Sequence, residues 1–214
     1  MTLGYANGVG LAPGPDGRAN GSYEFKGTSD SYIEIANSAG EALDVHHSMT
    51  MLCWLYFGGQ NGPFFHYGTN NDSGVHFWVY DEKLHARFMQ RNYSLTTALS
   101  HTTLTDGWKF VGASYNSFSG NATLFVDGDV VQTVNIGAGL ELATQDKVIM
   151  GRKIGDNRYF KGRIAQMQVY NLALTQEQIE TIQKRTGQNL SFWFCFCCCF
   201  QMISELMTWQ NRAT

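Results

Sequence analysis

The sequence lacks the features of nucleic-acid-binding and membrane-spanning proteins. Its 214 residues contain no run of Lys or Arg and carry a net charge of -3, so little is available to neutralise a phosphate backbone. The apolar stretch from Phe192 to Ile203 is shorter than the ~20 residues that a helix needs to cross a bilayer. We therefore expect no nucleic-acid partner and no membrane-spanning helix.

Cysteine is scarce in most of the chain. Cys53 stands alone in the body, whereas four cysteines crowd into the segment FWFCFCCCF near the end. This distribution excludes a disulfide framework, and adjacent cysteines lack the C-x-x-C spacing of zinc sites. We expect one folded domain over residues 1–187. Residues 188–214 form a hydrophobic Cys-rich tail, which is either open to acylation or a stretch that runs past the true end of the domain.

The amino terminus has no positively charged start followed by an apolar core, so no secretory signal is predicted. An extracellular domain with this sequence would therefore be part of a larger protein. Sequons for N-glycosylation, which would be usable outside the cell, occur at Asn20, Asn71, Asn92, Asn121 and Asn189.

Glycine and aromatic residues are abundant, and they favour many short strands joined by turns. There are 23 glycines and 14% aromatic residues. The opening residues 1–21 are rich in glycine and proline and are expected to be irregular. Strands are predicted at 22–25, 32–35, 49–56, 108–116, 122–126, 129–136 and 148–152. The segment 49–56 is apolar at nearly every position, which indicates a central strand covered on both faces.

The clearest hairpin is GVHFWVYDEKLHARF, with Asp81 and Glu82 as a two-residue turn. Alternation places one set of side chains in the core: Val75, Phe77, Val79, Leu84, Ala86 and Phe88. The opposite set combines aromatic and cationic groups, which are costly to bury, and forms the candidate ligand-binding site: His76, Trp78, Tyr80, Lys83, His85 and Arg87.

A strand followed by a capped helix is predicted over residues 161–187. In the strand, Ile164, Gln166 and Gln168 alternate with Ala165, Met167 and Val169, and the face with Met167 and Val169 is expected to be buried. Thr175 and Gln178 have the spacing of a capping box, and the helix is expected to end near Gly187.

The segment KGRIAQMQVYNLALTQEQI resembles the closing strand and helix of laminin-G-like, concanavalin-like domains. Further similar segments follow in family order, namely the strand at 32–35, the strand that begins at Trp108 and the hairpin at 124–130. The resemblance spans roughly residues 22–185. It implies an all-β fold, a two-sheet antiparallel β-sandwich of the jelly-roll type with one short C-terminal helix.

The resemblance also raises catalysis and calcium as possibilities. Glycanases on this sandwich need two facing carboxylates, typically from an E-x-D-x-(x)-E strand, and no such strand is present. Many related domains bind calcium through a carboxylate on the last strand, where this chain has Ala165 and Gln166, so no cofactor is assigned. Calcium could still bind among loop aspartates: Asp16, Asp30, Asp72 and Asp156.

These observations predict a non-catalytic extracellular recognition module. Trp78 with His76 and Tyr80 suits the stacking of a sugar ring, and Lys83, Arg87 and Arg91 would favour a sulphated or carboxylated glycan. An ordinary structural role, in which Trp78 packs under a loop or against Lys and Arg stems, stays open. So does protein adhesion through loops at 70–74 and 155–159; a glycoside hydrolase relative is the weaker alternative.

Overall fold

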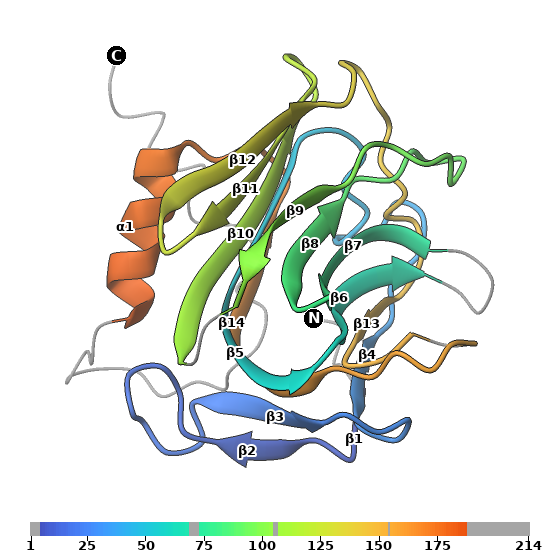
Figure 1. Cartoon of the computed structure of the whole chain (residues 1–214). Coiled ribbons are helices and arrows are strands. Elements are labelled where there is room, and N and C mark those ends of the chain that lie inside the picture. Colours follow the sequence, from blue (N-terminus) through green and yellow to red (C-terminus); the bar gives the residue numbers. More distant parts are fainter. Residues whose placement is uncertain (1–4, 69–72, 105–106, 154, 188–214) are drawn as a thin grey trace.

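The chain folds as a two-sheet antiparallel β-sandwich of the jelly-roll type (Figure 1), as the sequence predicts. The computed structural model describes residues 5–68, 73–104, 107–153 and 155–187. Within these residues each sheet has seven strands and one helix is present. The Cys-rich tail at 188–214 lies outside the described residues.

Sheet A contains the candidate hairpin. Its strands are, in spatial order, β1 (Tyr5–Asn7), β4 (Tyr32–Ile35), β13 (Val148–Met150), β6 (Gly62–Gly68), β7 (Ser73–Tyr80), β8 (Lys83–Arg87) and β9 (Leu99–Thr103).

Sheet B forms the other layer. Its strands are, in spatial order, β12 (Asp129–Asn135), β11 (Asn121–Val126), β10 (Trp108–Asn116), β5 (Met49–Gln60), β14 (Lys161–Tyr170), β3 (Ser22–Lys26) and β2 (Gly10–Ala12). Strand β5 lies between β10 and β14, so the prediction of a central strand at 49–56 is confirmed.

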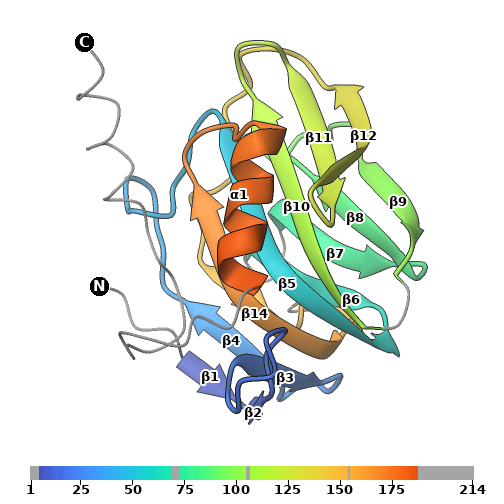
Figure 2. The same ribbon diagram turned by 90° about the vertical axis from the view of Figure 1, so that its left-hand side faces the viewer.

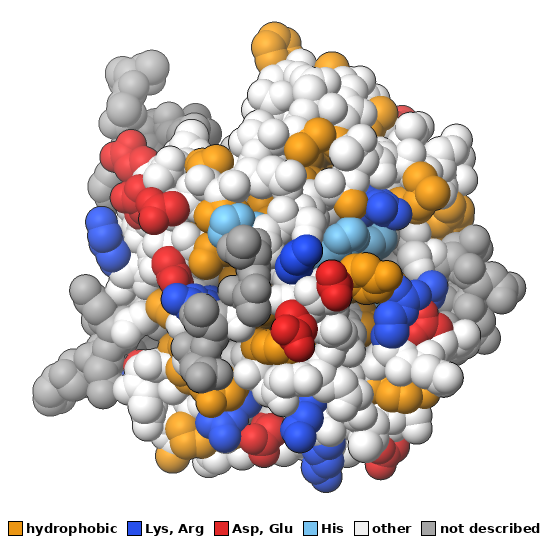
Figure 3. Space-filling model, viewed as in Figure 1, with side chains coloured by type: hydrophobic (Ala, Val, Ile, Leu, Met, Phe, Trp, Pro, Cys, Tyr) orange, Lys and Arg blue, Asp and Glu red, His pale blue; other side chains and the backbone are white. Residues whose placement is uncertain are grey.

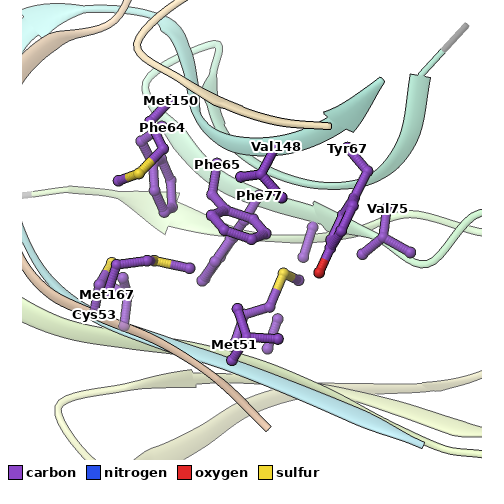
Figure 4. Close-up of a cluster of buried hydrophobic side chains, with 14 of the residues drawn as sticks. Met51, Cys53, Phe64, Phe65, Tyr67, Val75, Phe77, Val148, Met150 and Met167 are labelled. Atoms are coloured by element: carbon purple, nitrogen blue, oxygen red, sulfur yellow. The ribbon is translucent and has the colours of Figure 1, made fainter. Parts of the chain in front are cut away.

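The hydrophobic core fills the space between the sheets (Figure 4). Met51, Cys53 and Met167 from sheet B meet Phe65 and Phe77 from sheet A. Burial raises the pKa of the Cys53 thiol, so this cysteine is a small hydrophobic residue rather than a nucleophile. Each buried aromatic side chain contributes roughly 2 to 3 kcal/mol of apolar burial to the free energy of folding.

The helix α1 (Gln176–Gly187) covers the outer face of sheet B (Figure 2). Ile179 packs into a second apolar cluster with Leu52 and Phe110. The predicted capping box is present. The backbone N–H of Gln178 donates to Thr175 Oγ1 at 3.3 Å, and the backbone N–H of Thr175 donates to Gln178 Oε1 at 2.9 Å. Among the described residues no helix covers the outer face of sheet A.

Several features differ from the sequence-based predictions. The opening segment is not wholly irregular, because β1 pairs with β4 and β2 pairs with β3. Strands β6 and β9 were not predicted. The strict alternation of the last strand is also wrong, since Gln166 has a φ of +51° and the pairing of β14 with β5 shifts there. This β-bulge turns both Ile164 and Met167 into the core.

Candidate functional site

The β7–β8 hairpin has the predicted register. Trp78 pairs with His85, His76 with Arg87 and Tyr80 with Lys83. Because side chains alternate along a strand, these six residues lie on the outer face of sheet A, opposite the core residues of the same strands. We call this surface the hairpin face.

The six residues differ in burial. Tyr80 is 53% exposed, and Lys83 is also exposed. His85 and Arg87 are half-buried. His76 and Trp78 are each only 5% exposed. The hairpin face therefore has a buried centre of His76 and Trp78 and an accessible rim of the other four.

The segment after β13 covers the centre of this face. Arg152 and Tyr159 form a β-bridge that closes the segment on itself. Its Arg158 places the guanidinium carbon 4.4 Å from the centroid of the Trp78 ring, and Lys153 Nζ lies 6.0 Å from the same centroid. A sugar ring can stack on Trp78 only if the Arg158 side chain swings aside.

Sequence analysis missed His66, which belongs to the same cluster. It comes from β6, is fully buried, and has its ring centroid 6.3 Å from that of Trp78. The rings of His76 and His85 stack at 5.9 Å. The signal was the run GPFFHYG, in which one histidine interrupts large apolar residues between two glycines.

These histidines are held neutral at physiological pH. Burial lowers the pKa of His66 to about 3, although the backbone of Ile149 raises it. Burial likewise lowers the pKa of His76 to about 3, and the pKa of His85 to about 4 with help from the charges of Arg87 and Arg158. The His76 Nδ1 lies 2.8 Å from the Gly74 carbonyl oxygen. With its proton on Nδ1, the ring keeps an acceptor lone pair on Nε2.

Buried polar atoms without partners gather on this face. Trp78 Nε1 and Arg87 Nε have no hydrogen-bond partner among the described residues, and the His66 ring nitrogens, which the Ile149 backbone approaches, make no hydrogen bond of full geometry there. A buried polar group without a partner costs about 1 to 3 kcal/mol. The concentration of such groups around Trp78 is what a site that awaits a ligand would show.

The face carries cationic, aromatic and histidine side chains together. Figure 3 shows histidines among Lys, Arg and hydrophobic side chains over β7 and β8. Arg158 is bound to Asp156 through its Nε at 2.7 Å and through Nη2. Partial burial raises the pKa of Asp156, but hydrogen bonds and charge from Arg158 outweigh this and lower it overall. Arg158 is thus already paired with a carboxylate.

Arg91 does not join the hairpin face. Its guanidinium makes two hydrogen bonds to Asp44, at 2.8 and 2.9 Å, and the Asp44 side chain is buried. Thr144 Oγ1 and the Gly40 amide also donate to Asp44. The suggestion that Arg91 adds charge to the ligand site is therefore wrong, because its charge is paired with that of Asp44 and the pair links two loops.

The loop aspartates do not converge. Asp16 pairs with Arg18, Asp30 accepts from Thr28, and Asp156 is held by Arg158. Asp72 and part of the loop at 70–74 lie outside the described residues. In the part of the chain that the structure describes, no group of three or more metal-ligating side chains is found.

No described helix is long and apolar enough to cross a membrane.

Solved structures of other proteins share the fold of this chain. The chain is similar in structure to the crystal structure of the binding domain of Paraclostridial Mosquitocidal Protein 1, with 16% identity, a TM-score of 0.66 and coverage of 86% of this chain and 47% of that chain. It is also similar to the binding domain of Botulinum neurotoxin DC in complex with rat synaptotagmin II, with 13% identity, a TM-score of 0.67 and coverage of 86% and 47%.

A third similar structure is the ligand binding domain of Botulinum neurotoxin serotype D in complex with N-acetylneuraminic acid, with 13% identity, a TM-score of 0.67 and coverage of 86% of this chain and 46% of that chain. The chain thus spans about half the length of these structures, and at such identities the likeness shows the fold alone.

At the level of sequence, no curated protein matches the chain. The model of one family, described as the concanavalin A-like lectin/glucanases superfamily and of the laminin G type, matches residues 26–180. This match covers most of the sandwich, from the end of β3 into α1. The chain belongs to the concanavalin A-like lectin/glucanases superfamily.

Proposed function

We propose that this domain is a non-catalytic binding module whose hairpin face binds a glycan. The observation that carries the proposal is the group of unpartnered buried atoms around Trp78, on a face rimmed by accessible polar and aromatic side chains. Sugar hydroxyls both donate and accept hydrogen bonds. Trp78 Nε1 and Arg87 can donate to them, while His76 Nε2 can accept.

The accessible rim would make the first contacts with the glycan. Tyr80 offers an exposed aromatic ring, and Lys83, His85 and Arg87 offer polar atoms around it. Trp78 and His76 would complete the site after the Arg158 side chain rotates away. The Arg158 side chain is 38% exposed and can rotate toward solvent once its hydrogen bonds to Asp156 break.

The carboxylates of sheet A's outer side support a non-catalytic role. Glu34 pairs with Lys147 at 3.0 Å, and Asp156 is engaged by Arg158. A glycoside hydrolase needs one carboxylic acid and one free carboxylate across the sugar. Two carboxylates already bound to cations are poorly suited to that pair of roles.

Protein binding is the second candidate. It is favoured by a neighbour of the same fold that was solved in complex with rat synaptotagmin II. In this chain the covering segment 155–159 would be a contact region, together with the loop at 70–74. Either function suits an extracellular or cell-surface location within a larger protein, and the sequon residues Asn20, Asn92 and Asn121 are exposed.

A glycan array probed with the full chain tests the proposal, in calcium and in chelator. We expect specific binding that Tyr80→Ala and His85→Ala both weaken. Trp78→Ala is a third variant, with thermal unfolding as a check because this residue is buried. The matched control is Trp108→Ala, a half-buried tryptophan on sheet B.

The outcomes separate the candidates. Binding that depends on calcium would point to a metal site among the loop aspartates. Two results would overturn the glycan proposal for this face: no glycan binding with calcium or with chelator, or binding that the hairpin variants leave unchanged. Either result would favour a protein partner.

A further inference from the structure

Most cations around the hairpin face are already engaged by a carboxylate, a carbonyl or an aromatic ring. Lys147 pairs with Glu34 at 3.0 Å, Lys83 lies 3.7 Å from Asp81, and Arg158 and Lys153 share Asp156. Arg152 donates to the Ser29 carbonyl and stacks on the Tyr32 ring. Arg87, like Arg152, forms no ion pair with a carboxylate among the described residues. It differs from Arg152 because, in the same part of the chain, its guanidinium has neither a carbonyl partner nor an aromatic ring to stack on.

Arg87 is also half-buried, which makes the missing partner costly. Its Nε is shielded from solvent and has no hydrogen-bond partner in the described part of the protein. A guanidinium has five donors and no acceptor, and a partly buried charge is normally paired. Its cross-strand partner His76 and its neighbour His85 are neutral imidazoles, so neither supplies the negative charge.

Trp78 Nε1 is the second unpartnered donor on the same strand pair. Trp78 and Arg87 are diagonal neighbours, since Trp78 faces His85 and Arg87 follows His85 by two residues. An indole N–H can only donate. The two groups therefore require an acceptor, and the guanidinium requires a negatively charged one.

We propose that the hairpin face takes an acidic glycan, whose carboxylate or sulphate oxygens are held by Arg87 with Trp78 as a further donor. This inference rests on the proposed glycan-binding function and names its ligand class. Both oxyanions present two or more acceptor oxygens that match the fork of a guanidinium. Arg158 is already bound to Asp156 and does not supply the charge that selects the ligand.

Titration calorimetry of the full chain with matched oligosaccharides tests this proposal. One pair is a sulphated chain and its desulphated form, and the other is a uronic-acid chain and its carboxyl-reduced form. We expect the acidic member of at least one pair to bind more tightly, and Arg87→Gln to weaken that binding about ten- to a hundred-fold. Which pair responds identifies the oxyanion. Raising the salt concentration should weaken the same binding.

Two variants serve as controls for charge. Lys147→Gln and Arg158→Gln each remove one positive charge from the same side of the sandwich. We expect each to weaken binding of the acidic glycan less than Arg87→Gln does. Equal losses of affinity in all three variants would mean that binding depends only on the overall positive electrostatic field. That result would overturn the role of Arg87.

Stability separates a ligand-binding arginine from a structural one. Because Arg87 is unpaired in the folded protein, Arg87→Gln should leave the midpoint of urea unfolding unchanged or raise it. A clear loss of stability would show a structural role. Acidic and neutral members bound equally would refute the inference and leave the glycan proposal intact, whereas no glycan binding at all would refute the proposed function itself.

Discussion

Arg158 lies over the indole of Trp78, with 4.4 Å between the guanidinium carbon and the ring centroid. The two residues are far apart in the sequence, and their contact decides how much of the predicted site is open. Arg158 stacks on Trp78 while its Nε donates to Asp156. Arg158 therefore covers the face of Trp78 on which the proposed sugar would stack.

Arg158→Ala should uncover the Trp78 ring. We expect the exchange of the Trp78 indole proton with solvent, followed by NMR, to become faster. Loss of the cation–π contact should lower the free energy of unfolding by about 1 kcal/mol. Lys153→Ala is the control, since Lys153 Nζ is 6.0 Å from the ring centroid and should matter less. Unchanged exchange in Arg158→Ala would show that other atoms cover the ring.

The Asp44–Arg91 pair should be a stabilising contact without a role in binding. Arg91→Leu leaves a buried carboxylate without its cation, and we expect a loss of about 3 kcal/mol in urea unfolding. Asp44→Asn combined with Arg91→Leu should cost less than the two single changes together, because the two side chains are coupled. Glycan affinity should stay unchanged in folded Arg91→Leu. Strictly additive losses would argue against the coupling.

A substitution in the turn of the β7–β8 hairpin should increase the stability of the protein. Asp81 and Glu82 have φ values of +52° and +56°, as in a type I′ turn, and this region favours glycine over glutamate. Glu82→Gly should raise the free energy of unfolding by about 1 kcal/mol. Glu82→Ala keeps a Cβ atom and should give little gain. A gain from alanine equal to that from glycine would assign the effect to the lost charge instead.

The hairpin shows what could be predicted from the sequence. Its register followed from the two-residue turn and from strict alternation on both strands, and the structure has the same pairs. The short edge strands β1 and β2 escaped prediction because three residues are too few to show a clear period, and both strands lie in a glycine-rich opening segment. The bulge at Gln166 escaped it because a positive φ at glutamine has no signal in the sequence.

The burial within the candidate site depends on long-range contacts, so the sequence could not define it. Alternation places Trp78 on the outer face, but only the fold brings Arg158 onto it. The same holds for His66, which reaches the cluster because β6 pairs with β7. Arg91 looked like a further cation near the hairpin, and only the loop geometry reveals its bond to Asp44.

Acid should destabilise the protein through the buried histidines. The pKa values of His66 and His76 are lowered to about 3, so between pH 3 and 6.5 the unfolded chain binds more protons than the folded one. Stability is therefore complete above pH 6.5 and falls as the pH decreases. Each of these histidines contributes at most about 1.4 kcal/mol per pH unit.

Replacing one histidine should flatten this dependence. We expect His66→Phe to reduce the slope of unfolding free energy against pH, measured by urea denaturation between pH 4.5 and 8. Asp44 contributes little in this range, because its lowered pKa matters only below its ordinary value of 3.8. Phe77→Leu is the control, since it loosens the core without removing a titratable group and should leave the slope unchanged. An unaltered slope in His66→Phe would mean that His66 binds the same number of protons in the folded and the unfolded protein.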